Sequence, residues 1–179
     1  ARDKFLAIML AQAERMSRLI DDLMSLSRIE LNEHIAPLGR VDLAMAAVDV
    51  IDALAPQARE KVVTFDPVLP PRGGAVVDGD RDQIIQVIQN LIDNAIKYTP
   101  TGKAVRISLR SGVSAGAAAA VGDPRAARFS LLTPDRASDL YAALRVSDAG
   151  VGLAREHLPR LTERFYRVEG QKSGERSGT

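Results

Sequence analysis

The sequence predicts an α+β fold, in which helices cover one face of a mixed or antiparallel sheet and a long helix precedes this two-layer sandwich. Residues 3–31 and 83–98 place apolar side chains at helical spacing. Residues 104–110 and 142–146 instead alternate apolar and polar side chains, as half-buried strands do. Strands and helices grouped in this order are typical of a sheet with helices on one side.

The composition restricts the function classes. Apolar residues make up 46% and charged residues 26% of the 179 residues, which is ordinary for a folded protein. A net charge of +1 gives no basic field, so we expect no nucleic-acid partner and no membrane contact by this segment. The absence of cysteine excludes disulfides and cysteine-ligated metal centres. No apolar run approaches the ~20 residues that span a bilayer, so we expect a cytoplasmic segment.

The first predicted element, residues 1–33, is a long helix with a wide apolar face. Met9, Ala13, Met16, Ile20 and Leu23 repeat at steps of four and three, which is a coiled-coil spacing. Such a helix cannot bury its own face, so it requires partner helices or must pack on its own domain as a terminal helix. The interpretation that we favour is one helix of a dimeric four-helix bundle.

Residues 34–40, with a proline and a glycine, are predicted to be a hinge, and residues 41–179 a second unit. We expect a strand at 41–43, a helix at 44–61 and strands at 62–65 and 75–77. Asp80 is a suitable N-cap for the helix that ends near Tyr98. Residues 111–140, rich in alanine and glycine at their start, are predicted to be a flexible insertion, with an extra hairpin near 129–132.

The helix at 83–98 carries a polar stripe. Because successive helical residues are about 100° apart, Asn90, Asn94 and Lys97 fall within roughly 60° of one another, with Tyr98 at the edge. Amide oxygens and an ammonium group suit a Mg²⁺-nucleotide, although many polar stripes are simply solvated. The opposite arc is aliphatic and predicted to be buried: Ile84, Ile85, Ile88, Leu91, Ile92, Ala95 and Ile96.

A second group of residues follows the strand at 142–146. Asp148 can accept a hydrogen bond from an amino group such as that of adenine, and Gly150 and Gly152 allow a close backbone approach. An ordinary turn has the same composition. A short helix at 154–162 and the aromatic pair at 165–166 come next. They suggest a lid hinged on an aromatic anchor, or merely the edge of the core followed by a frayed tail.

Together and in this order, these motifs resemble the kinase core of sensor histidine kinases of two-component systems. Residues 90–98 (NLIDNAIKY) look like the family's asparagine motif, 148–152 (DAGVG) like its first glycine motif and 164–167 (RFYR) like its phenylalanine motif. Residues 14–30 are similar to the second helix of the dimerisation and histidine-phosphotransfer domain, most like that of phosphate-regulon sensors. The resemblance covers most of the chain outside the insertion.

The resemblance implies an ATP site of the Bergerat type, the fold of histidine kinase-like ATPases, with Mg²⁺ as the accompanying metal. Asn94 would be the principal Mg²⁺ ligand, and Asn90 would assist at the metal or the phosphates. Lys97 and Tyr98 would contact the phosphates or brace the site. Phosphoryl transfer depends chiefly on positioning and charge neutralisation, and these residue types contribute to both.

The same resemblance assigns the remaining candidate residues. Asp148 would bind the adenine amino group, while Gly150 and Gly152 would shape the pocket and the hinge of the lid. Phe165 would anchor the lid, and Arg167 would face the phosphates.

The chain departs from the family pattern at its two histidines. The family's phosphoacceptor histidine belongs to a first helix, whereas His34 lies in the predicted hinge and His157 lies before the phenylalanine motif. We therefore expect neither histidine to be the phosphoacceptor. Residues 177–179 look like the start of a second glycine motif, so we expect an internal fragment that does not autophosphorylate by itself.

The resemblance also implies two partners: a second copy of the chain, bound through the first helix, and a response-regulator receiver domain. It further implies that the parent protein is anchored in the bacterial inner membrane. Three alternatives remain: a related ATPase, a non-catalytic ATP-binding or dimerisation module, and a helical scaffold without ligand. The related ATPases place a glutamate base one turn before the metal-binding asparagine. Asn90 occupies that position here, and a neutral amide cannot accept the proton, which favours phosphoryl transfer over hydrolysis.

Overall fold

The computed structural model describes residues 39–120, 140–161 and Tyr166, together with scattered positions between Arg2 and Ser27. The chain divides into two compact units, Ala1–Pro37 and Leu38–Thr179. Residues 34–38 of the predicted hinge at 34–40, which include His34, lie outside the described residues, and the last hinge residue, Arg40, begins a strand. The predicted hairpin at 129–132 and the segment at 177–179 also lie outside the described residues.

In the first unit, every described position between Arg2 and Ser27 is helical, as the spacing predicted. None of the helices formed by described residues is both long and apolar enough to cross a bilayer.

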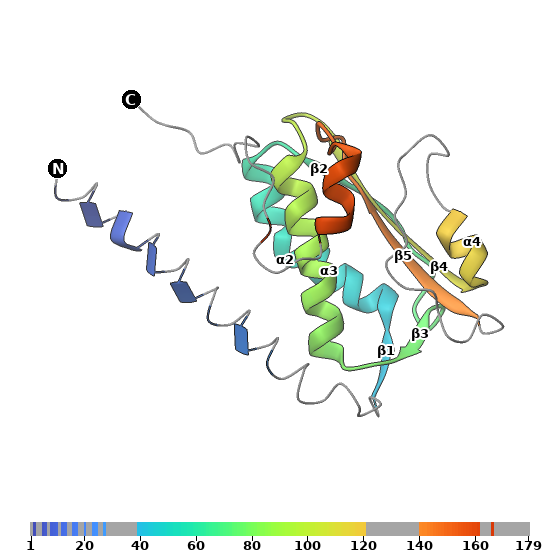
Figure 1. Cartoon of the computed structure of the whole chain (residues 1–179). Helices are drawn as coiled ribbons and strands as arrows, with labels where there is room; N and C mark the ends of the chain where they lie inside the picture. Colours follow the sequence, from blue (N-terminus) through green and yellow to red (C-terminus); the bar gives the residue numbers. More distant parts are fainter. Residues whose placement is uncertain are drawn as a thin grey trace. The chain divides into compact units, whose positions relative to one another are not determined.

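The second unit contains two small sheets (Figure 1). Strand β2 (Thr64–Val68) pairs in parallel with β4 (Ala104–Val113), and β4 pairs antiparallel with β5 (Tyr141–Ser147). Strand β1 (Arg40–Asp42) pairs antiparallel with β3 (Val76–Asp78). The α+β class is confirmed, but the prediction of one sheet is wrong for the described strands. The three-residue strands β1 and β3 form backbone hydrogen bonds with each other and not with the strands of the larger sheet.

Helices α2 (Leu43–Glu60) and α3 (Arg81–Tyr98) pack together on one face of the larger sheet (Figure 1). The core between these layers takes Ile88, Ile92 and Ile96 from α3 and Val105 and Ile107 from β4, all at most 1% exposed. Burial of the aliphatic arc of α3 therefore determines which of its faces is left for function.

Both helices begin at an aspartate that caps them. Asp80 Oδ1 accepts hydrogen bonds from the amides of Asp82 and Gln83 at 2.9 and 3.1 Å, so this predicted cap is confirmed. Asp42 Oδ1 caps α2 in the same way, while its Oδ2 accepts from the Gly73 amide at 2.6 Å. The Gly73 hydrogen bond is the main reason that the pKa of Asp42 lies below its ordinary value.

Two predicted segments differ in detail. The start of the predicted insertion is ordered secondary structure: β4 continues to Val113 opposite Tyr141, and α4 (Ala115–Ala120) follows. β4 is longer than predicted because it pairs with β5. The local composition after residue 110 does not indicate this pairing. The predicted helix at 154–162 is the 3₁₀ helix η1 (Arg155–Arg160), and it contains Pro159, which lacks the amide donor of an α-helix.

Candidate functional site

The exposed face of α3 carries the predicted metal and phosphate residues. Asn90, Asn94 and Tyr98 are exposed, and Lys97 is half-buried. Among the described residues, the side-chain amides of Asn90 and Asn94 have no hydrogen-bond partner. Their oxygens are therefore not engaged by another described side chain, and their role as ligands stays a prediction.

One residue of the predicted buried arc lies on this open face instead. Leu91 is 45% exposed and shares the surface with Val87, which is 57% exposed. The predicted arc was too wide, because Leu91 lies only about 60° from Asn94 around the helix. The open face is thus mixed, with apolar side chains beside the asparagines.

Lys97 and Tyr98 interact at the end of α3. The Lys97 ammonium lies 5.5 Å from the centroid of the Tyr98 ring, within the range of a cation–π interaction. This contact orients both side chains at the end of the helix nearest to the glycine-rich turn.

Gly150 brings the two predicted motifs together. Asp148 Oδ1 accepts a hydrogen bond from the Gly150 amide at 2.7 Å, which closes a tight turn after β5. A Cβ atom at position 150 would lie 2.7 Å from Asp148 Oδ1 and 3.0 Å from the Tyr98 carbonyl oxygen. Only glycine fits between these atoms, so the aspartate turn lies directly against the last turn of α3.

Gly152 has a different requirement. Its φ of +73° is in the left-handed region, and a Cβ atom there would meet nothing within 4 Å. The position needs glycine for its backbone conformation rather than for space.

Tyr166 lies against η1. Its hydroxyl is 2.6 Å from His157 Nδ1, and the Arg160 guanidinium carbon lies 4.2 Å from its ring centroid. This cluster is not indicated by the sequence, since the spacing of nine residues between His157 and Tyr166 matches no regular periodicity. Phe165 and Arg167, the predicted lid residues on either side of Tyr166, lie outside the described residues.

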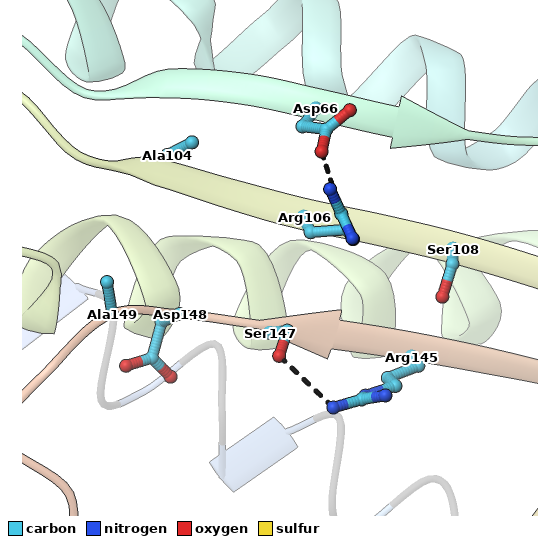
Figure 2. A pocket seen from close by; sticks show the side chains of 8 residues that line it. All are labelled: Asp66, Ala104, Arg106, Ser108, Arg145, Ser147, Asp148 and Ala149. Carbon is cyan, nitrogen blue, oxygen red and sulfur yellow. Dashed lines mark hydrogen bonds and ion pairs between the residues drawn. The ribbon is translucent and has the colours of Figure 1, made fainter. Parts of the chain in front are cut away.

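A cavity of about 330 Å³ lies on the sheet surface opposite the helices, and Figure 2 shows its polar side chains with the helices behind the strands. Arg106 pairs with Asp66 at 2.7 Å, and Arg145 lies 3.4 Å from the Ser147 hydroxyl. Of the predicted site residues that the structure describes, only Asp148 lines this cavity. The charged side chains that line this cavity are paired, as is usual on a solvated sheet surface. None of the predicted site residues of α3 lines it.

Residues 79–179 match the model of a family described as histidine kinase-, DNA gyrase B- and HSP90-like ATPases. The match begins at the glycine before the α3 cap and includes every predicted site residue. The chain belongs to this family, whose domain binds ATP.

Individual relatives point to one branch of the family. The chain is 28% identical over 176 residues to the sensor histidine kinase WalK of Bacillus subtilis, covering 98% of this chain and 24% of WalK. It is 27% identical over 176 residues to the sensor-like histidine kinase SenX3 of Mycolicibacterium smegmatis, covering 98% of this chain and 38% of SenX3. The predicted resemblance to sensor histidine kinases, which are enzymes, is confirmed.

The phosphate regulon sensor protein PhoR of Pseudomonas aeruginosa is also similar, at 28% identity over 94% of this chain and 32% of PhoR. Because its identity equals that of WalK, the phosphate-regulon subgroup stays a prediction. The chain spans about a quarter to two fifths of the length of these three relatives.

Solved structures support the fold. The mycobacterial sensor histidine kinase MprB has a TM-score of 0.51 at 22% identity, over 73% of this chain and 67% of that chain. The catalytic domain of histidine kinase ThkA has a TM-score of 0.51 at 17% identity, over 74% of this chain and 72% of that chain. The arrangement of α2, α3 and the larger sheet is therefore that of a histidine kinase catalytic domain.

Proposed function

We propose that this chain is the ATP-binding kinase core of a sensor histidine kinase. In the whole protein it directs the γ-phosphoryl group of ATP to a histidine, from which the group passes to a response regulator. The observation that carries this proposal is the close approach of Gly150 to the Tyr98 carbonyl. It joins the aspartate turn, suited to a nucleobase, to the helix whose open face bears Asn90 and Asn94.

The metal and phosphates belong on the open face of α3. Asn94 would hold Mg²⁺ with help from Asn90, because both present unoccupied amide oxygens and Mg²⁺ prefers oxygen ligands. Mg²⁺ supplies neutralisation of phosphate charge. The described residues contain no cluster of three or more acidic or histidine side chains for a metal. We therefore expect Mg²⁺ to bind together with the nucleotide rather than alone, with Lys97 adding a positive charge.

The nucleobase belongs at the aspartate turn. One carboxylate oxygen of Asp148 is held by the Gly150 amide, so the other can accept a hydrogen bond from the adenine amino group. Tyr98 would brace the site, and Gly152 would provide the hinge of a lid that Phe165 anchors. Arg167 would face the phosphates from that lid.

Transfer is favoured over hydrolysis because the position one turn before Asn94 carries the neutral amide Asn90 and not a carboxylate. The two acidic residues of α3 are Asp82, in its first turn, and Asp93. Asp93 Oδ1 accepts a hydrogen bond from the Gln57 side chain of α2 at 2.7 Å, so this carboxylate is already paired with the neighbouring helix. Asn90 cannot act as a base on water, so we propose a protein side chain as the phosphoryl acceptor.

Calorimetry of Mg-ADP binding to the full chain tests the site. We expect Asn94→Ala and Asp148→Ala each to weaken binding by about tenfold or more, because each removes a contact to a charged or buried polar group. Gln89→Ala is the control, since this exposed side chain of α3 points roughly 100° away from Asn90. Unchanged affinity in both site variants would show that the assignment is wrong.

The reaction itself is tested in the whole parent protein with radiolabelled ATP. Label on a histidine that moves to a receiver domain supports the kinase proposal. Nucleotide binding without labelling favours a non-catalytic module, and phosphate release without labelling favours an ATPase. Recovery of the parent protein in the soluble fraction would contradict our expectation of an inner-membrane anchor.

We also propose that the first unit dimerises. Its large apolar side chains that the structure describes are each more than half exposed in the single chain, and a second copy that covers them would stabilise the unit. They include Phe5, Met9, Met16, Ile20 and Leu23. A monomeric molar mass in light scattering of the full chain would contradict the dimer.

A further inference from the structure

The last turn of α3 is held by a lysine from α2. Lys61 Nζ donates a hydrogen bond to the Ile96 carbonyl at 2.7 Å and a second to the Lys97 carbonyl. The final carbonyl groups of a helix have no donor within the helix. Here an ammonium from another element satisfies two of them, and its charge opposes the negative end of the helix dipole.

The backbone around Lys61 is itself constrained, so the ammonium group extends from a fixed position. Lys61 is the C-cap of α2, and its amide donates to the Gln57 carbonyl at 3.2 Å. The next residue, Val62, has a φ of +57°, which a β-branched residue rarely adopts. The Val62 carbonyl accepts from the Gly102 amide at 2.8 Å, which ties this corner to the loop that follows α3.

The carbonyls held by Lys61 are next to the contact that joins the two motifs. The Thr99 amide donates to the Ala95 carbonyl at 3.0 Å, but Thr99 itself has an extended backbone, so α3 stops at Tyr98. The Tyr98 carbonyl is the atom that Gly150 approaches. An unwound last turn would therefore move both this carbonyl and the Lys97 side chain.

We propose that Lys61 is a positioning residue for the nucleotide site. It keeps the last turn of α3 helical, and thereby holds Lys97 and Tyr98 in register with the Asp148 turn. Its contacts are with main-chain carbonyls, so it acts through α3 and not on the ligand. This inference rests on the proposed function, because it states how the two parts of that site are kept together.

The test compares three variants of the full chain. Lys61→Met removes the ammonium and keeps an unbranched side chain, while Lys61→Arg restores a cationic donor. Arg81→Met is the matched control, since Arg81 also links α3 to α2, through Asp49 at 2.7 Å, but at the opposite end of α3. If Lys61→Met does not fold, Lys61→Gln, which keeps a neutral donor, takes its place.

We expect Lys61→Met to speed amide hydrogen exchange at Tyr98 and Thr99 about tenfold and to weaken Mg-ADP binding by a similar factor, since bonds from charged donors are the stronger ones. Lys61→Arg should restore most of the exchange protection and most of the Mg-ADP affinity. Arg81→Met should change neither the exchange rates at Tyr98 and Thr99 nor the affinity. A role in stability alone would lower the unfolding temperature without this pattern of loss and rescue.

Two results overturn the inference and are distinguishable from each other. If the wild-type chain binds Mg-ADP and Lys61→Met binds it equally well, Lys61 has no positioning role, although the proposed function stands. If the wild-type chain binds no Mg-ADP, the proposed function is wrong and the role of Lys61 falls with it.

Discussion

Helix α3 and the 3₁₀ helix η1 are held in the second unit by different means. Helix α3 has 18 residues, an aspartate cap and four buried side chains. Helix η1 has six residues, no buried side chain and no side-chain hydrogen bond at its N-cap Ala154. The structure instead holds η1 against Tyr166 through His157 and Arg160.

The difference concerns how each part contributes to the site. Burial in the core holds the asparagine face of α3 whether or not ligand is present. Segments with few buried apolar contacts open at lower free energy than the core, so η1 belongs to the more easily displaced side. In the site that we propose, α3 would be the fixed side, and η1 would be the side that moves when a nucleotide enters or leaves.

The largest effect should come from the core side of α3. Ile92 is fully buried, so Ile92→Ala should lower the free energy of unfolding by about 2–5 kcal/mol through lost burial and a residual cavity. Urea denaturation measures this change. Val87→Ala, at a position 57% exposed, should change it by less than about 0.5 kcal/mol. Equal effects would break the comparison, because α3 would then not depend on the core.

The next effect concerns the contact between α3 and the aspartate turn. Gly150→Ala should cost about 1–3 kcal/mol, because the new methyl group overlaps Asp148 Oδ1 and the Tyr98 carbonyl. It should also weaken Mg-ADP binding. Gly152→Ala meets no atom within 4 Å and should cost about 1 kcal/mol through its left-handed backbone alone. Thermal unfolding and calorimetry separate the two variants, and normal nucleotide affinity in Gly150→Ala would contradict the contact.

A smaller and local effect is expected at η1. Tyr166→Phe removes the hydroxyl that lies 2.6 Å from His157 Nδ1 and keeps the ring beside Arg160. The loss should be about 1 kcal/mol, seen as faster hydrogen exchange of the His157 and Leu161 amides with global unfolding unchanged. The amides of α3 are the internal reference. Equal acceleration in α3 would mean that the two helices open as one unit.

The smallest effect tests the aspartate caps, which η1 lacks. The Gly73 amide is the main cause that lowers the pKa of Asp42 in the folded chain. A lowered folded-state pKa contributes stability above the unfolded value of about 3.9, and this contribution is lost as the pH falls through the folded value. Urea denaturation at several pH values should therefore show wild type and Asp42→Asn converging below about pH 4. A constant difference across that range would contradict the cap as the cause.

Much of α3 could be predicted because its signals are local. Asp80 precedes the first turn, the apolar residues recur at helical spacing, and Pro100 follows the last turn. These features act within a few residues of one another, so the cap, the length and most of the buried face followed from the sequence. The one wrong assignment, Leu91, lies at the boundary of the buried arc, where the neighbouring layer decides burial.

The sequence by itself determined the motif residues, their order and the family, because those depend on residue type and spacing along the chain. The tertiary structure decided which separated residues meet: β2 beside β4, Lys61 at the end of α3, and Gly150 against the Tyr98 carbonyl. Such contacts depend on how layers pack and where backbone groups remain without donors. Neither property is encoded in the periodicity of a single segment.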